Sequence, residues 1–260
     1  MGPMRPARGS SWLVVLLGAA YFILPLVATL QFSLQTGTRP LFSAYSSILT
    51  ASGFWASLGL SLFMALAAVA IGLLLIIPAA YWAYLRAPKV RTWVEFLSIL
   101  PFVVPPIVLV FGMVGLYGNG FGPLSSPMVL ILAAYGVISM PYLFRSIDNG
   151  LRSVDLRTLT QAALSLGAGW PVILLRIVLP NLRTAILGGA FLVFALIMGE
   201  YAISSMLGFN TFGVYMLLTG QTRAHAAAAL ALISFALVWV FVGFMHAVNR
   251  GNITFGPGAR

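Results

Sequence analysis

Residues 153–180 read SVDLRTLTQAALSLGAGWPVILLRIVLP, and this segment lies within a chain that is otherwise strongly apolar. Ser153 is a residue type that caps helices, and Asp155 stands in the first turn, where the helix dipole favours an anion. An apolar stripe at helical spacing follows, formed by Leu156, Leu159, Ala163 and Leu166. Gly167 then predicts the C-terminal end of this helix.

A second short helix is predicted from Trp170 to Val178, because Pro171 suits the first turn of a helix. Pro180 is expected to end it and to turn the chain back toward the next apolar run. The small residues Ala162, Ala163 and Gly167 are expected to be exposed, which would allow a close approach by a partner. From the residues alone, an ordinary helical connector and a docking surface both stay open, since loops that bind and loops that only connect look alike.

The whole chain has the composition of a membrane protein. Its 260 residues are 61% hydrophobic and 7% charged, and the mean hydropathy is +1.03. A soluble chain of this length needs far more charge to cover its surface, whereas spanning helices satisfy their own backbone hydrogen bonds in lipid. We therefore predict an all-α, polytopic membrane protein with a single transmembrane domain over residues 1–260.

Six apolar segments are long enough to cross a bilayer core ~30 Å thick, which takes about 20 helical residues. They lie at about Trp12–Leu30, Phe54–Tyr84, Val94–Tyr117, Met128–Phe144, Ala185–Met206 and Ala226–Val248. The first resembles a signal peptide, but it is too long and lacks a clear cleavage site, so we expect it to be retained. Three prolines interrupt the third segment, and membranes tolerate them where neighbouring helices satisfy the freed carbonyls. They are Pro101, Pro105 and Pro106.

The basic residues predict the orientation. With a cytoplasmic N-terminal segment, 1–11, the inner segments hold twelve of the fourteen basic residues and the outer segments hold Arg39 and Arg223. The twelve are Arg5, Arg8, Arg86, Lys89, Arg91, Arg145, Arg152, Arg157, Arg176, Arg183, Arg250 and Arg260. Since positive charge gathers on the cytoplasmic side, both termini are expected inside.

Several other classes of function find little support. The net charge of +10 does not indicate nucleic-acid binding, because the basic residues are scattered rather than clustered. Cysteine is absent, and His225 and His246 lie in different segments without acidic neighbours at ligand spacing, so we expect no metal site and no cofactor on this chain. Neither Gly-x-Ser-Gly nor His-Glu-x-x-His occurs, which argues against a membrane enzyme, and no catalytic residue is predicted.

The quoted segment resembles the EAA loop of binding-protein-dependent ABC importer permeases of type I. That family's pattern is Glu-Ala-Ala, three residues, Gly, nine residues, then Ile-x-Leu-Pro, and the loop lies two spans before the C-terminus. Here the loop covers about residues 145–183, between the fourth and fifth predicted spans, and every spacing matches. The matching positions, which the resemblance assigns to ATPase coupling, are Gln161, Ala162, Ala163, Leu166, Gly167, Ile177, Leu179 and Pro180.

The resemblance implies that the first loop helix is a coupling helix, which inserts into a groove on a cytoplasmic ATPase. Ala162, Ala163, Leu166 and Gly167 match the positions at that contact. Gln161 replaces the usual Glu, which removes a possible ion pair but keeps a hydrogen-bonding group, so we expect altered coupling strength rather than its loss.

The resemblance also implies the partners. They are two cytoplasmic ATP-binding subunits that carry ATP and Mg²⁺, a second permease subunit that is identical or homologous, and an extracytoplasmic solute-binding protein, assembled in a bacterial inner membrane. The sequence agrees, because its only lysine, Lys89, stands in Ala-Pro-Lys-Val and no Walker A loop is present to hold phosphates. ATP hydrolysis is therefore expected on a separate chain. An ATP-independent channel or carrier is the alternative.

Two stretches, LPFVVPPIVL at 100–109 and FALIMGEY at 194–201, resemble the permeases for spermidine/putrescine, 2-aminoethylphosphonate, thiamine and iron. A polyamine is the first expectation for the solute, with the other three as alternatives.

Glu200 is an acid within a predicted span, where an acid usually faces a cavity or a partner. It either lines the translocation pathway with Tyr201 and Ser204, or reaches the outer interface or caps a neighbouring helix. Glu95, beside Arg91, is expected to pair locally.

Overall fold

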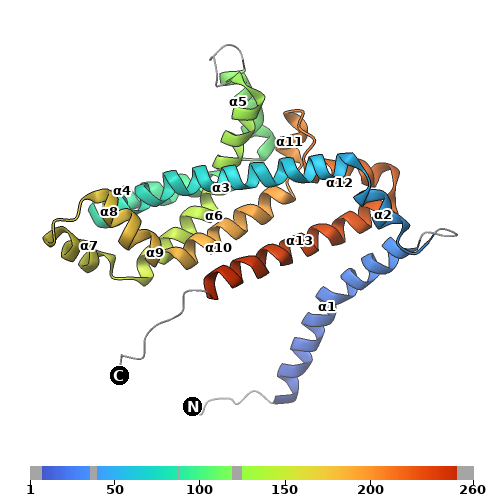
Figure 1. Cartoon of the computed structure of the whole chain (residues 1–260), viewed down its shortest axis with the longest axis horizontal. Coiled ribbons are helices and arrows are strands. Elements are labelled where there is room, and N and C mark those ends of the chain that lie inside the picture. The colour runs from blue at the N-terminus through green and yellow to red at the C-terminus, as the bar shows by residue number, and fades with distance from the viewer. Residues whose placement is uncertain (1–7, 36–39, 87, 119–124, 251–260) are drawn as a thin grey trace. The chain divides into compact units, whose positions relative to one another are not determined.

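The computed structural model describes residues 8–35, 40–86, 88–118 and 125–250, and within these ranges the regular elements are helices, which confirms the predicted all-α class (Figure 1). The elements that precede the loop are α1 (Arg8–Leu34), α2 (Ser43–Leu49), α3 (Ser52–Arg86), α4 (Pro88–Val103), α5 (Pro106–Tyr117) and α6 (Pro127–Ser153). The loop holds α7 (Leu156–Ser165), α8 (Trp170–Ile173), the π-helical segment η2 (Leu174–Val178) and α9 (Leu179–Asn181). The remaining helices are α10 (Arg183–Met198), α11 (Ala202–Met206), α12 (Phe212–Thr222) and α13 (Ala224–Arg250).

Four unbroken helices in the described part of the chain are long and apolar enough to cross a membrane. They are Trp12–Leu34, Ser52–Leu85, Pro127–Ser153 and Ala224–Ala247, and they correspond to the first, second, fourth and sixth predicted spans. Two strongly bent helix pairs raise the number of candidate spans to six if each pair is one span. The polytopic architecture is therefore confirmed.

The third predicted span is not one helix. Val90–Val103 and Pro106–Tyr117 meet at an angle of 104°. The bend falls on Pro105, whose extended backbone (φ −58°, ψ 140°) precedes α5. Proline lacks a backbone N–H and drives the residue before it out of the helical conformation, so two consecutive prolines stop α4 and start a new helix.

The fifth predicted span ends earlier than expected. Helix α10 stops at Met198, and the five-residue α11 follows after a break at residues 199–201. The backbone of α12 approaches this break closely at Gly213. A Cβ built on Gly213 would lie only 2.9 Å from the carbonyl carbon of Glu200. The chain therefore folds back on itself where the sequence predicted a continuous helix to Met206.

Two compact units divide the chain, one formed by Met1–Trp55 and Met216–Leu237, the other by Ala56–Tyr215 and Val238–Arg260. In the second unit α10 packs along α6, and small residues bring the two helices close together. Ser146 donates a hydrogen bond of 2.6 Å to the carbonyl of Ala185. A Cβ on Gly150 would lie 2.6 Å from the Cβ of Ala185, so this position accommodates only glycine without a shift.

In the first unit, the C-terminal end of α1 is tied to two other segments. His225 Nδ1 lies 2.8 Å from the carbonyl oxygen of Phe32, and the two rings are 4.5 Å apart. The Ser33 hydroxyl lies 2.8 Å from the Tyr45 hydroxyl in α2. The rest of α1 projects apolar side chains outward, as expected for a helix that lipid surrounds.

An ion cluster joins α4 to α6. Asp148 is largely buried, and its carboxylate accepts hydrogen bonds from Arg91 at 2.7 Å and from Arg152 at 2.8 Å. The expected local pairing of Arg91 with Glu95 is therefore wrong, since the Arg91 guanidinium binds Asp148 instead. A two-arginine partnership compensates the cost of burying this acid near the end of α6.

Candidate functional site

The loop between α6 and α10 contains the two helices that the sequence predicted, with a different cap. Ser153 is the last residue of α6, and Asp155 is the N-cap of α7, where its carboxylate accepts a hydrogen bond of 3.2 Å from the backbone N–H of Thr158. The hydroxyl and the backbone N–H of Thr158 hold the pKa of Asp155 below its ordinary value, and Arg157 adds to this effect. The carboxylate, not the serine, therefore fixes the start of α7.

Helix α7 is amphipathic, and its apolar residues lie on two faces rather than one. Leu156 and Ala163 are buried together with Thr160, whereas Leu159 and Leu166 of the predicted stripe are exposed. Leu166 is the extreme case, with 88% of its surface accessible. One face of α7 thus packs against its own chain, and the other leaves apolar side chains uncovered.

The C-terminal end of α7 is a Schellman motif, and this explains the glycine of the loop. Gly167 donates its N–H to the carbonyl of Leu164 at 2.9 Å, and Ala168 donates to Ala163 at 3.0 Å. Gly167 has φ +78°, a left-handed conformation that other residue types adopt only with strain. A Cβ built on Gly167 would have no atom of the described chain within 4 Å, so the requirement for glycine within this chain is conformational.

The second part of the loop is helical from Trp170 to Asn181, but its middle is not a regular α-helix. The segment Leu174–Val178 is π-helical, a form that is rare and often found at functional sites. The prediction that Pro180 ends the second loop helix is wrong. Pro180 lies in the first turn of α9, where proline is tolerated, and the bend of 73° follows at Leu182. Ile177 and Leu179 are half-buried and Pro180 is exposed.

The residues assigned to coupling therefore divide into two groups. Gln161, Ala162, Leu166 and Gly167 lie on the outer surface of α7 and its cap, where a partner has access. Ala163 faces the interior of its own chain, so its small size serves packing rather than contact. Sequence reasoning missed a residue that supports this loop from α3, Tyr81, whose hydroxyl lies 2.7 Å from that of Thr160. No pattern in the sequence marks this pair.

Glu200 lies in the break between α10 and α11, and its carboxylate caps α11. One carboxylate oxygen accepts the N–H of Ile203 at 2.7 Å, and the other accepts the Tyr135 hydroxyl at 2.9 Å and the Ser204 hydroxyl at 3.0 Å. Tyr135 and Ser204 are fully buried, whereas Tyr201 is half-exposed. The alternative that Glu200 caps a neighbouring helix is thus what the geometry favours, and Tyr135 is a partner that the sequence did not reveal.

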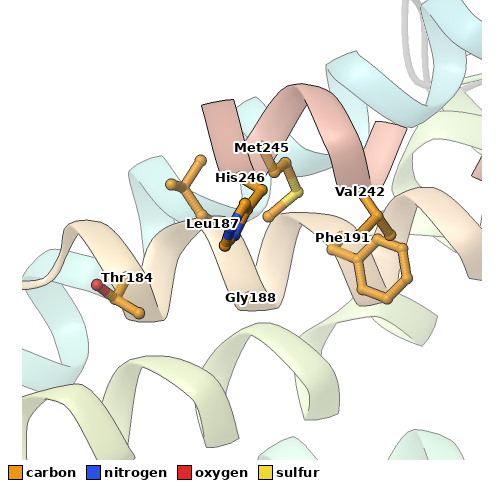
Figure 2. A pocket seen from close by; sticks show the side chains of 7 residues that line it. All are labelled: Thr184, Leu187, Gly188, Phe191, Val242, Met245 and His246. Atoms are coloured by element: carbon orange, nitrogen blue, oxygen red, sulfur yellow. The ribbon is translucent and has the colours of Figure 1, made fainter. Parts of the chain in front are cut away.

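A shallow groove of about 270 Å³ lies between α10 and the C-terminal half of α13 (Figure 2). Its lining is mostly apolar and consists of Thr184, Leu187, Gly188, Phe191, Val242, Met245 and His246. A single imidazole and a single hydroxyl among five apolar or small residues suit lipid chains or another apolar helix better than a polar solute. Within residues 8–35, 40–86, 88–118 and 125–250, no three His, Asp or Glu side chains come together as a metal site requires.

Comparison with known proteins points to the same family as the resemblance of the loop. Residues 72–253 match the family model described as the binding-protein-dependent transport system inner membrane component. A probable molybdenum ABC transporter permease protein of Haloferax volcanii is 32% identical over 193 residues, which cover 71% of this chain and 69% of that protein. The molybdenum transport system permease protein ModB of Mycobacterium tuberculosis is 28% identical over 85% of this chain and 87% of its own length.

Two further comparisons extend this result. The spermidine/putrescine transport system permease protein PotB of Haemophilus influenzae is 29% identical over 62% of this chain and 60% of its own length. The fold matches the crystal structure of a bacterial ABC transporter involved in the import of the acidic polysaccharide alginate, with a TM-score of 0.70, 14% identity, and coverage of 94% of this chain and 95% of that chain. The chain therefore belongs to the binding-protein-dependent ABC transporter permeases, as a multi-pass inner membrane subunit that is not itself catalytic and that works with an ATPase and a binding protein.

Proposed function

We propose that this chain and a second permease, identical or homologous, form the translocation pathway above two ATPase subunits, and that the segment from α7 to α9 docks on one of them. The observation that carries the proposal is the exposed cap of α7, where Leu166 and Gly167 lie on the surface. Both termini are placed on the ATPase side, which the distribution of basic residues supports.

The exposed apolar surface of the loop supports docking on a protein. Six large apolar residues of this short segment are more than one third exposed: Leu159, Leu164, Leu166, Trp170, Val172 and Leu175. Burying a leucine side chain gains about 1.5–3 kcal/mol, so Leu166 alone would contribute a substantial share of a docking free energy. Two exposed basic residues of the same segment, Arg157 and Arg176, would add contacts to an acidic partner surface.

For the cargo, we propose molybdenum, which is present as the molybdate oxyanion in neutral water. Support comes from the relatives named for molybdenum transport, which match over most of their length. The expectation of a polyamine came from the resemblance of residues 100–109 and 194–201 to a group of permeases that includes those for spermidine/putrescine, and Glu200 would support it as an acid open to a cation. That carboxylate is engaged with hydrogen-bond donors on α6 and α11, which weakens this motivation. A polyamine remains the second candidate, because one relative carries spermidine/putrescine in its name.

The test is an uptake assay in cells that express the complete transport system and in matched cells that lack this chain. Molybdate and spermidine are supplied separately, and cell-associated molybdenum and polyamine are measured. We expect accumulation of molybdenum that depends on this chain and that tungstate, a closely similar oxyanion, inhibits. Chain-dependent uptake of spermidine without uptake of molybdate would reverse the order of the two candidates. Uptake of either solute that continues after ATP is depleted would contradict the proposed ATP-driven import.

A further inference from the structure

A buried polar contact ties the loop to α3. The hydroxyl of Tyr81, near the end of α3, lies 2.7 Å from the hydroxyl of Thr160 in the middle of α7, although 79 residues separate them in sequence. Only 2% of Tyr81 and 4% of Thr160 are exposed. In Figure 1, α7 and α8 lie at the end of the bundle where α3 gives way to α4. This contact therefore joins the proposed docking helix directly to a candidate membrane span.

The contact fixes the position of α7 along α3 more strictly than packing alone would. Apolar surfaces can slide past one another at little cost, because burial is non-directional, whereas a hydrogen bond holds only at one register. In a buried setting the two hydroxyls are strongly bound to each other, since water is not available to replace either partner. A shift of α7 by one residue would break the bond unless the end of α3 moved with it.

Two features would let the end of α3 follow a movement of α7. Pro78 lies one turn before Tyr81 inside α3, where it removes a backbone hydrogen bond and makes the helix easier to bend. A cavity of about 310 Å³ lies beside Tyr81, between α3 and the second loop helix, with Trp82 and Trp170 among its lining residues. The rings of Tyr81 and Trp170 meet edge to face with centroids 6.2 Å apart, so both parts of the loop contact the same tyrosine.

We propose that Tyr81 and Thr160 form a latch through which movement of α7 is passed to the end of α3 beyond Pro78. The inference rests on the proposed function, in which an ATPase moves α7. Tyr81 and Thr160 are positioning residues here: neither contacts the ATPase or the solute, and together they make the docking helix and the membrane span move as one piece.

The test compares Tyr81→Phe, Thr160→Val and the double variant in liposomes that contain the complete purified transporter, with molybdate as the solute. Tyr81→Phe keeps the ring and its contact with Trp170, and Thr160→Val keeps the shape of the side chain, so each breaks the hydrogen bond with little change in packing and leaves the other hydroxyl buried without this partner. Tyr84→Phe, one turn further along α3, is the matched control, because no hydrogen bond to α7 is lost there. The quantity measured is the number of ATP molecules hydrolysed per solute imported, with ATPase retention measured in parallel.

We expect each single variant to raise the ATP used per solute by about fivefold, the size that follows from a hydrogen bond worth about 1 kcal/mol. The double variant should show no larger effect than the single ones, because both substitutions break the same bond and the double variant leaves no buried hydroxyl unpaired. ATPase retention and the Tyr84→Phe control should stay at the wild-type level.

Three results would overturn the latch. In the first, the ATP hydrolysed per solute stays at the wild-type value in the single variants. In the second, the double variant shows the product of two separate effects. In the third, ATPase retention falls while the ATP hydrolysed per solute is unchanged, which would make the contact purely structural. A wild-type transporter without ATP-driven uptake would instead refute the proposed function, so the two failures are distinguishable.

Discussion

Substitutions at Gly167 test the proposed docking surface most sharply, because the strain that a side chain puts on the backbone can be separated from any clash with neighbouring atoms. Its φ of +78° is left-handed, and a Cβ built there meets nothing within 4 Å in the described chain. Gly167→Ala thus introduces backbone strain without a clash in the permease itself. Gly169 is the matched control in the same loop, since its φ of −77° suits any residue and a Cβ there meets only an ordinary contact at 3.9 Å.

The magnitude follows from the left-handed conformation, which costs an ordinary residue about 1–2 kcal/mol. That free energy corresponds to about a 5- to 30-fold loss in the affinity of a partner that requires the native cap. Asparagine adopts this conformation more readily than alanine, so Gly167→Asn should lose less affinity than Gly167→Ala if strain alone matters. If the partner packs against the glycine, the larger asparagine should lose more.

The assay is the affinity of detergent-solubilised permease for its purified ATPase subunit, measured for wild type and for the Gly167→Ala, Gly167→Asn and Gly169→Ala variants. We expect Gly167→Ala to bind about 5- to 30-fold more weakly than wild type. Gly169→Ala should bind like wild type. Equal affinity for all four proteins would show that the conformation at this cap has no bearing on docking, and α7 would then not be the docking helix.

Three further predictions concern the Glu200 cap, the packing of α6 on α10 and the orientation of the chain in the membrane. Glu200→Gln should lower the free energy of unfolding by about 1–3 kcal/mol, because the glutamine amide has one acceptor oxygen where the carboxylate has two for the same donors. Transport of molybdate and of spermidine should then fall equally, whereas a loss of spermidine uptake at unchanged stability would indicate that Glu200 lines the translocation pathway. Gly150→Ala should destabilise the α6–α10 packing by about 1–3 kcal/mol in a melting assay, whereas Gly136→Ala, where a Cβ meets nothing within 4 Å, should not. In this cysteine-free chain, a cysteine at exposed Ser46 should react with an impermeant reagent from outside intact cells and one at exposed Ser153 should not; the reverse pattern would invert the orientation.

The local features of the loop could be predicted from the sequence because they depend on neighbouring residues. The end of α7 at Gly167 follows from chemistry within one turn of helix. The start of α7 shows the limit of this approach, since Ser153 and Asp155 are both capable caps and the sequence favoured the wrong one. Long apolar runs likewise predicted four spans that the structure has as unbroken helices, because about 20 apolar residues suffice to specify such a helix.

The remaining features depend on contacts between residues far apart in sequence. Asp148 binds Arg91 across 57 positions, and this overrode the local pairing expected for Glu95. Glu200 was recognised as unusual, but its partner Tyr135 lies 65 positions earlier, so the choice between pathway and helix cap could not be made. The 104° bend between α4 and α5 was also missed, because prolines signal an interruption but not its angle.

The most direct test of the docking loop uses Leu166, a residue that is 88% exposed at the cap of α7. The Leu166→Cys variant is labelled with a photoactivated thiol crosslinker in membranes that contain the complete transporter, and the crosslinked product is identified by mass spectrometry. We expect a crosslink from Leu166→Cys to the ATPase subunit, and no such crosslink from a cysteine at Ser46. Crosslinking of the ATPase from Ser46 but not from Leu166, while the ATPase still co-purifies with the permease, would contradict this expectation.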